Sequence, residues 1–319
     1  MYILFSNKDV ASSETRGNLL YKKYISNSNI LKIIETSFWH RNFYNKILIS
    51  LKILSIYFLN FKSKKYAICL KFTPLFIFFI CRFLKVEIIY DCDDLIWSDN
   101  FFGKKKTSIL FSLSSRIILE NSFLKTNLLG NLNKFHKNLN IINCPLPEYK
   151  IEKKNLIKKK IFIPTYIYIG SKYSFSEVFP LLDLINSKKK LWNLTMLGSN
   201  IDKSKYNFLN DLICLPSYNS EKMCNYLDNS DIGIYHKASL DIDKGRGFHK
   251  KLIYLSRGLP ILSKFSYERN LISNSHINLD DCWSEDIIQK KQEKLIHLEI
   301  IKNWNLNIKN KINKIFKIN

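Results

Sequence analysis

The chain has 319 residues, and 46% of them are apolar. Because a chain so rich in Ile, Leu, Phe and Tyr buries enough apolar surface to offset its ordering entropy, disorder is excluded as its main state. Only nine Gly and seven Pro are present, which excludes collagen-like and low-complexity classes. Fifty Lys and Arg against 27 Asp and Glu give a formal net charge of +23, which favours an anionic partner.

The kind of basic residue favours a membrane surface over nucleic acid. Seven of the fifty are Arg, whereas nucleic-acid readers depend on Arg for bidentate contacts with bases and phosphates. Anionic lipids at the inner face of a membrane require only positive charge. A coding sequence biased toward Lys, Asn and Ile is the alternative source of the charge. The predicted partners are therefore an anionic membrane surface and no nucleic acid.

No secretory signal or membrane span is expected, and the Cys pattern favours a reducing cytoplasm. Residues 1–6 are apolar but are accompanied by no basic region and no small-residue cleavage site. The most apolar stretch, residues 74–84, is shorter than the roughly 20 residues of a span and contains Arg82. Seven scattered Cys without a C-x-x-C pair support neither a disulfide framework nor a structural zinc site.

The first half of the chain predicts one Rossmann-like domain, residues 1–150. Strands are expected at 1–6, 30–35, 66–71, 86–90, 116–119 and 140–143. A loop at 7–17 and helices ending near residue 26 and covering 45–61 and 74–84 are expected between them. Strands that alternate with helices favour a parallel sheet with right-handed crossovers. Two Pro and a Lys run at 145–160 then indicate a linker.

The second half repeats the alternation, which predicts a second Rossmann-like domain, residues 151–284. Strands are expected at 166–169, 192–197, 212–215, 231–235 and 259–263, and helices at 175–187, 220–228 and 250–257. A basic helical segment, residues 285–319, follows, and we expect it to pack back toward the N-terminal domain. Two doubly wound domains in tandem place a ligand in the crevice at the carboxyl ends of the strands, between the domains.

The strongest functional signal is GRGFHKKLIYLSRGLP at 245–260, preceded by DIGIY at 231–235. The Gly residues at its start would let the backbone approach a phosphate, and the helix that follows presents free N–H groups to it. Arg246, Lys250 or Lys251 would then neutralise a leaving nucleoside diphosphate, which is stabilisation of a transition state by fixed charge. The alternative is a surface turn with solvated lysines.

The order of these motifs resembles the C-terminal domain of GT-B glycosyltransferases. In that family a helix with the pattern K-x-x-x-Y-L-x-x-G-x-P follows a Gly- or Pro-rich loop; the matching residues here are Lys250, Tyr254, Leu255, Gly258 and Pro260. Upstream, YIYIGSKYSF, LTMLGSN and LPSYNSEKMCNYLDNSDIGIY resemble the first strand and loop, the second strand, and the base-binding loop with its helix and strand. The likeness spans about residues 160–265. IIYDCDDLIW in the first half also looks like the D-x-D-D segment of some bacterial polysaccharide glycosyltransferases.

The resemblance implies that the second domain holds a nucleotide-sugar donor. The predicted donor-binding residues are Gly170, Ser171, Lys172, Tyr218, His236, Arg246, Gly247, Phe248, His249 and Lys250. A structural role is the alternative for each His. Many retaining members carry two Glu eight positions apart, but Gly245 and Ile253 stand at the equivalent positions. Other residues must therefore recognise the ribose of the donor. Whether the transfer retains or inverts the configuration of the anomeric carbon is not assigned.

Candidate catalytic residues follow a strand of the first domain. Asp91, Asp93 and Asp94 are close enough to raise one another's pKa, which suits a general base, and they would also serve as acceptor ligands or a metal site. The alternative is helix capping and a solvated acidic turn. Glu14 and Arg16 lie on the loop after the first strand and are the predicted acceptor-binding residues.

These observations predict a metal-independent glycosyltransferase of the hexosyltransferase class without a cofactor. Its sugar would pass from a nucleotide-sugar to a lipid-linked oligosaccharide in the synthesis of capsule, O-antigen or another surface polysaccharide. The protein would be cytoplasmic and peripheral at the inner face of the plasma membrane. Segments 45–61 and 74–84 would either lie on the bilayer or cover the first sheet. The alternative function is a catalytically inactive GT-B-fold nucleotide-binding or scaffold subunit.

Overall fold

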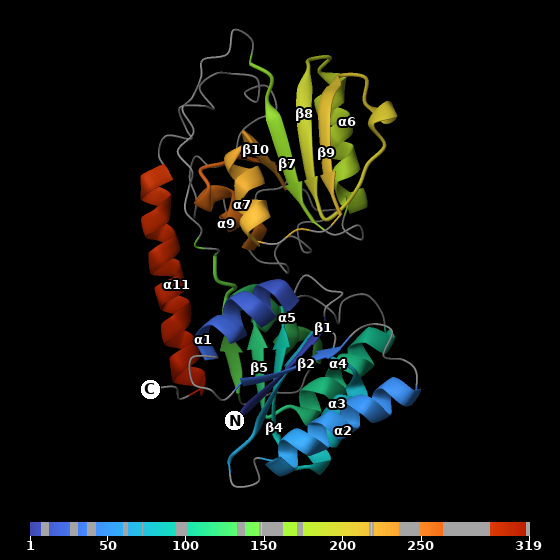
Figure 1. Cartoon of the computed structure of the whole chain (residues 1–319), viewed down its shortest axis with the longest axis vertical. Coiled ribbons are helices and arrows are strands. Elements are labelled where there is room, and N and C mark those ends of the chain that lie inside the picture. The colour runs from blue at the N-terminus through green and yellow to red at the C-terminus, as the bar shows by residue number, and fades with distance from the viewer. Residues whose placement is uncertain are drawn as a thin grey trace. The chain divides into compact units, whose positions relative to one another are not determined.

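A computed structural model describes residues 1–7, 13–25, 31–36, 43–59, 63–71, 73–93, 101–132, 138–146, 148, 162–170, 175–216, 218, 220–235, 249–263 and 294–316. These residues form two compact units (Figure 1). The first unit comprises the described residues up to Pro145 and those from Leu306 onward, and the second comprises the described residues between Leu146 and Asn305. Each unit has a parallel sheet with helices packed on both of its faces.

The first unit is built on a six-stranded sheet in the order β2-β1-β3-β4-β5-β6, in which every neighbouring pair is parallel. The strands are β1 (Tyr2–Asn7), β2 (Leu31–Thr36), β3 (Tyr66–Leu70), β4 (Glu87–Cys92), β5 (Arg116–Leu119) and β6 (Leu139–Ile141). The chain reverses its direction of travel after β2, because β2 and β3 lie on opposite sides of β1. Right-handed crossovers therefore place the helix between β1 and β2 on one face and the later helices on the other.

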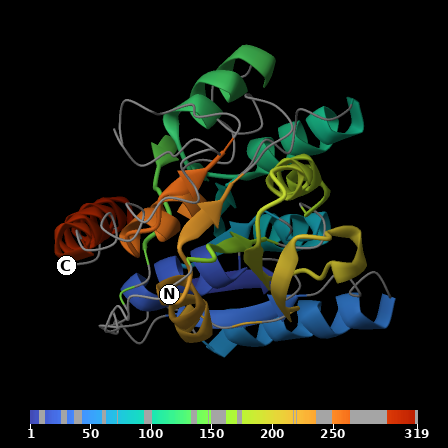
Figure 2. The same cartoon turned by 90° about the horizontal axis from the view of Figure 1, so that it is seen from above.

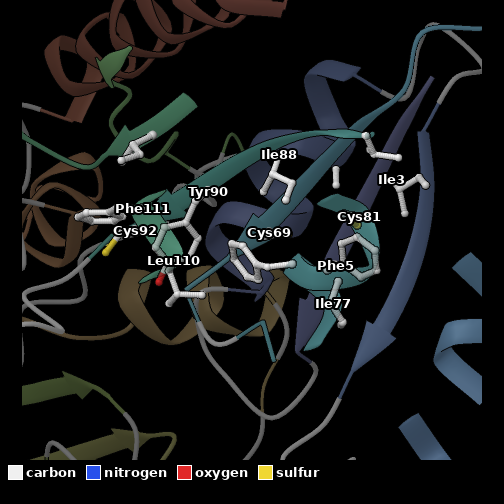
Figure 3. Close-up of a cluster of buried hydrophobic side chains, with 14 of the residues drawn as sticks. Ile3, Phe5, Cys69, Ile77, Cys81, Ile88, Tyr90, Cys92, Leu110 and Phe111 are labelled. Atoms are coloured by element: carbon white, nitrogen blue, oxygen red, sulfur yellow. The ribbon is translucent and has the colours of Figure 1, made fainter. Parts of the chain in front are cut away.

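The helices of the first unit follow this rule. The helical segment between β1 and β2 runs through η1 (Ser13–Lys22) into α1 (Lys23–Ile25). The opposite face is covered by α2 (Phe43–Leu59), α3 (Leu75–Phe83), α4 (Phe101–Leu113) and α5 (Ser122–Leu132). Side chains from these four helices join those of the strands in one buried cluster, part of which is drawn in Figure 3. Alternate strand residues such as Ile3 and Phe5 reach this cluster because successive side chains of a strand point to opposite faces.

The second unit has a five-stranded parallel sheet in the order β11-β10-β7-β8-β9. Its strands are β7 (Thr165–Ile169), β8 (Trp192–Leu197), β9 (Leu209–Leu215), β10 (Ile232–Ile234) and β11 (Ile261–Leu262). One face is covered by η3 (Phe175–Val178) and α6 (Phe179–Ser187), and a single turn, η4 (Lys203–Lys205), precedes β9. The other face is covered by α7 (Ser220–Asp228) and α9 (His249–Ser256).

The last helix, α11 (Lys294–Phe316), contributes to both units. In the first unit the Tyr2 hydroxyl donates to the Phe316 carbonyl at 2.7 Å, and Arg116 Nη1 donates to the Ile315 carbonyl at 2.6 Å. These bonds satisfy carbonyls that the end of a helix otherwise leaves without a partner. In the second unit the Asn305 side chain bonds to both backbone groups of Leu146, at 2.8 and 2.9 Å. The expectation that the C-terminal helix packs back toward the N-terminal domain is confirmed.

The two Rossmann-like folds expected from the sequence are confirmed, with differences in some elements. Helix begins at Ser13 rather than after the loop expected at 7–17, and β4 continues through Cys92, so that Asp91 lies inside a strand. The helices α4 and α5 were not expected from the sequence. In α4 the apolar pattern is interrupted by Gly103 and a Lys run, and in α5 it is interrupted by Gly130. Among the described helices, none combines the length and apolarity that a membrane crossing requires.

Candidate functional site

The candidate donor site lies at the carboxyl ends of β7 and β8, where each strand passes into a Gly. The Gly170 N–H donates to the Leu197 carbonyl at 2.9 Å, which joins the two strand ends. Gly198 has φ +89°, and a Cβ placed on it would stand 2.6 Å from the Gly170 carbonyl oxygen. Both the positive φ and the close approach require Gly at position 198. The two strand ends are thus held backbone against backbone, without side chains between them.

Two aromatic residues and one Lys surround this pair of Gly. A Cβ on Gly170 would clash with the Tyr168 hydroxyl, and a Cβ on Gly198 would lie 3.4 Å from the Tyr218 ring. Lys250 is half-buried in the first turn of α9, and its Nζ lies 5.5 Å from the centre of the Tyr168 ring. We call these five residues the strand-end cluster. It places one ammonium group, in the first turn of a helix, beside the close-packed ends of two strands, and an ammonium with the free N–H groups of a helix start suits a phosphate.

The position of α9 beside the strand ends is set by Tyr254. Its buried hydroxyl accepts from the Ile169 N–H at 3.0 Å and donates to the Ile234 carbonyl at 3.1 Å, so it joins β7 to β10. A Cβ on Gly233 would stand 2.5 Å from the Tyr254 ring, so that only Gly allows the ring to pack there. Burial raises the pKa of Tyr254 well above 10.0, so this hydroxyl stays protonated and keeps both bonds.

The far end of α9 is closed by the motif that the sequence carries after Tyr254. Gly258 has φ +69°, its N–H donates to the Leu255 carbonyl at 2.8 Å, and the Leu259 N–H donates to the Tyr254 carbonyl at 3.0 Å. This is the left-handed cap that ends a helix at a Gly. The residues of the pattern Y-L-x-x-G-x-P thus end α9, whereas Lys250 in its first turn lies near Tyr168 of β7.

The neighbouring Lys differs from Lys250 in its environment. Lys251 is 2% exposed, and its Nζ lies 4.7 Å from the centre of the Tyr235 ring, just after β10. A buried ammonium held over an aromatic face packs as part of the protein interior. Of the two, Lys250 is therefore the better placed for a bound anion.

Ser199 was not predicted as a site residue, although it directly follows Gly198. Its Oγ is buried, and among the described residues it has no hydrogen-bond partner. A buried hydroxyl at the carboxyl end of a strand, beside the strand-end cluster, is suited to a ligand. The repeated Gly-Ser after both β7 and β8 is the sequence signal that would have found it.

In the first unit, the predicted acceptor residue Arg16 and the predicted catalytic residue Asp91 bind each other. Arg16 is 0% exposed; its Nε donates to Asp91 Oδ2 at 2.9 Å and its Nη2 donates to Asp91 Oδ1 at 2.7 Å. The Tyr21 hydroxyl also donates to Asp91. Direct binding of a substrate by either charged group would require this ion pair to open.

A second carboxylate completes the buried charge cluster. Arg16 Nη1 donates to Glu120 Oε2 at 2.7 Å and to the Ile142 carbonyl at 2.6 Å. The Cys144 N–H donates to Glu120 Oε1 at 3.1 Å. Burial raises the pKa of Glu120 to about 7, opposed by the charge of Arg16. Burial likewise raises the pKa of Asp91, again opposed by Arg16, so the pKa rise expected among the acidic residues comes first from desolvation.

Asp93 is a predicted catalytic residue with a carboxylate oxygen that accepts no hydrogen bond from the described residues. It follows β4 and is partly exposed, and its Oδ1 is buried without a partner among the described residues. Strand β4 ends at the carboxyl edge of the sheet, where α/β folds place ligands. Asp93 is therefore better suited than Asp91 to contact a substrate.

Several predicted site residues fall outside what the structure describes. These are Asp94, Ser171, Lys172, His236, Arg246, Gly247 and Phe248. Glu14 and His249 lie in η1 and α9, but only their backbone is described. Their proposed roles stay predictions.

Solved structures with the same fold exist at low sequence identity. A glycosyltransferase from Rickettsia africae matches 100% of this chain and 99% of its own, with 13% identity and a TM-score of 0.64. Anabaena HepE, solved in complex with UDP and glucose, matches 99% of both chains, with 10% identity and a TM-score of 0.62. The chain has the GT-B fold.

The same fold occurs in enzymes of another class. UDP-GlcNAc 2-epimerase from Neisseria meningitidis, solved with UDP-GlcNAc bound, matches 98% of this chain and 100% of its own, with 9% identity and a TM-score of 0.53. No protein-family model and no curated protein matches the sequence. A GT-B fold by itself does not choose between transfer and epimerisation, since function resides in the site.

Proposed function

We propose that this GT-B chain is a glycosyltransferase that uses a nucleotide-sugar donor. The observation that carries the proposal is the strand-end cluster, in which Lys250 stands in the first turn of α9 beside the close-packed Gly170 and Gly198. A nucleoside diphosphate presents two phosphates, and the N–H groups at the start of a helix together with an ammonium group hold phosphates in α/β proteins. The solved relatives of this fold that carry UDP or UDP-GlcNAc support a nucleotide-sugar as the ligand.

The proposed reaction is the transfer of the sugar to an acceptor hydroxyl. The bond between the anomeric carbon of the sugar and the diphosphate oxygen breaks, and a bond to an acceptor hydroxyl oxygen forms. The departing diphosphate gains negative charge, which Lys250 and the N–H groups at the start of α9 would stabilise, so no metal or cofactor is proposed. A carboxylate takes the hydroxyl proton, and we assign that role to Asp93 because its Oδ1 has no other partner among the described residues.

The acceptor that we propose is a lipid-linked oligosaccharide of a surface polysaccharide. The support is the net charge of +23, which favours an anionic membrane over a soluble acceptor pool. The protein would then work in the cytoplasm, peripherally at the inner face of the plasma membrane.

Nucleotide binding is tested by thermal melting of the full chain with UDP, ADP and GDP. We expect one of them to raise the Tm, because a ligand that binds only the folded state stabilises it. In Lys250→Ala the shift should fall to a small fraction of that of the wild type, while the exposed Lys205→Ala serves as the matched control and retains it. No shift with any nucleotide, or an equal shift in Lys250→Ala, would overturn the proposal.

Epimerisation is the second candidate, favoured by the likeness to UDP-GlcNAc 2-epimerases. An epimerase converts UDP-GlcNAc without an acceptor, whereas a transferase releases UDP in amounts that depend on the acceptor. Incubation of the chain with UDP-GlcNAc, with and without extracted lipid-linked oligosaccharide, separates the two. We expect UDP release that depends on the lipid fraction; accumulation of the 2-epimer without it would replace transfer by epimerisation.

A further inference from the structure

Helix α2 is apolar on two opposite faces. Ile49 and Ile53 are buried in the core of the first unit, with Ile56 and Tyr57 packed against it. The residues on the other side are apolar as well but exposed to solvent: Tyr44, Ile47, Leu48, Leu51 and Phe58. Spacings of three, four and seven residues place these five on one stripe of the helix. A helix that only covers a sheet needs one such stripe, so the second requires another explanation.

The outer stripe is far more exposed than scattered surface apolar residues require. Tyr44 is 69% exposed, Phe58 63% and Leu59 80%. Helix α3, which follows on the same face of the sheet, adds Phe79 at 53% and Phe83 at 86%. Both views place α2 at the periphery of the first unit (Figures 1 and 2). Large apolar side chains exposed on two helices that cover the same face of a sheet mark an interaction site.

The charged residues of α2 and α3 themselves are all basic. Lys52 is exposed and lies beside the outer stripe of α2, whereas Lys46 lies three and seven positions before Ile49 and Ile53, on the side of the buried stripe. Arg82 and Lys85 are exposed at the end of α3. Residues 43–59 and 74–86 contain no Asp and no Glu. Helices whose exposed side chains are apolar and basic complement an anionic lipid surface, into which the apolar residues insert while the basic groups remain at the headgroups.

The geometry points to a peripheral membrane-docking surface on α2 and α3, whose partner is a bilayer rich in anionic lipid. We define the docking surface as Tyr44, Ile47, Leu48, Leu51, Phe58, Leu59, Phe79 and Phe83 with Lys52, Arg82 and Lys85. The helices lie on the bilayer rather than cross it, because the inner stripe of α2 stays buried in the core of the unit. This inference deepens the proposed function, on which it rests for the lipid-linked acceptor.

The test is sedimentation of the full chain with phosphatidylglycerol vesicles and, separately, with phosphatidylcholine vesicles. We expect binding to the anionic vesicles that weakens as salt is raised, and much weaker binding to the neutral ones. The double variant Leu51→Asp with Phe58→Asp should lose at least about tenfold in binding, because a carboxylate enters an apolar surface next to anionic headgroups. Lys52→Gln with Arg82→Gln should lose about fivefold per charge.

The matched control is a pair of equally exposed apolar residues in the second unit, Leu184→Asp with Leu191→Asp, which should bind vesicles as the wild type does. Melting curves verify that each variant is folded. Equal vesicle binding by the Leu51–Phe58 variant and the wild type would overturn the inference, as would a wild-type dimer that this variant converts to a monomer. The nucleotide-induced Tm shift is measured in the same variants, so that loss of docking with an intact shift leaves the proposed donor site standing.

Discussion

Arg16 and Asp91 form a buried, bidentate ion pair although they are 75 positions apart in the chain. Arg16 lies in η1, and Asp91 is the last residue but one of β4, near the carboxyl end of that strand. The pair ties the first crossover of the unit to the centre of its sheet. It also shares Arg16 with Glu120, so one cation serves two buried carboxylates.

Replacement of Arg16 by Met should strongly destabilise the first unit. Two carboxylates would then remain buried without a cation, which typically costs about 3–5 kcal/mol in the free energy of unfolding. Urea unfolding measures the loss. The exposed Arg82→Met is the matched control and should change stability by less than about 0.5 kcal/mol. An Arg16→Met protein as stable as the control would show that the ion pair is not what holds η1 in place.

The stability of the chain should depend on pH through Glu120. Its pKa is about 7 in the folded protein, above the ordinary 4.5, so the folded state holds the proton more tightly than the unfolded state. Its contribution is therefore complete below about pH 4.5 and is lost as pH rises through about 7. The free energy of unfolding of the wild type minus that of Glu120→Gln should decrease over that interval, by at most about 1.4 kcal/mol per pH unit, and be flat above it. A difference that rises with pH would contradict the buried, proton-binding carboxyl.

Replacement of Tyr254 by Phe should destabilise the second unit and disturb the donor site. The Ile169 N–H and the Ile234 carbonyl would lose a buried partner, which costs about 1–3 kcal/mol. Because Tyr254 also sets the position of α9, the nucleotide-induced Tm shift should decrease with stability. Thermal unfolding with and without the nucleotide measures both. Tyr226→Phe, on the partly exposed side of α7, is the comparison and should leave both nearly unchanged.

Ser199→Ala should separate stability from binding. Its Oγ has no partner among the described residues, so removal of the hydroxyl should leave the free energy of unfolding unchanged or raise it by up to about 1 kcal/mol. If the hydroxyl binds the donor, its removal should weaken nucleotide binding by about 1–3 kcal/mol. The nucleotide-induced Tm shift should then decrease as well. Ser187→Ala, exposed at the end of α6, should alter neither. An unchanged shift in Ser199→Ala would remove Ser199 from the site.

Much of the candidate donor site could be predicted from local sequence. The strand ends at Gly170 and Gly198 and the end of α9 at Gly258 are each encoded within a few residues, because a close approach of neighbouring atoms or a positive φ requires Gly there. The role of Tyr254 could not be predicted, because its two hydrogen-bond partners come from β7 and β10, 85 and 20 positions away.

The first unit departs further from the prediction. The acidic run after VEIIY indicated three equivalent carboxylates, yet Asp91 is buried and bound to Arg16 while Asp93 keeps an acceptor free of any described partner. Spacing along a strand fixes which face a residue takes, but not whether an oppositely charged side chain from another element reaches it.

By itself the sequence determined the order of the strands, the two-domain α/β plan and the helix that contains Lys250 and ends at Gly258, because periodicity, glycines and caps act over a few residues. Only the tertiary structure decided that Arg16 neutralises Asp91 and Glu120 in the interior, and that α2 buries one apolar stripe and leaves the other exposed. The physical reason is that burial depends on which distant element lies against a side chain, and the local pattern of apolar and charged residues does not carry that information.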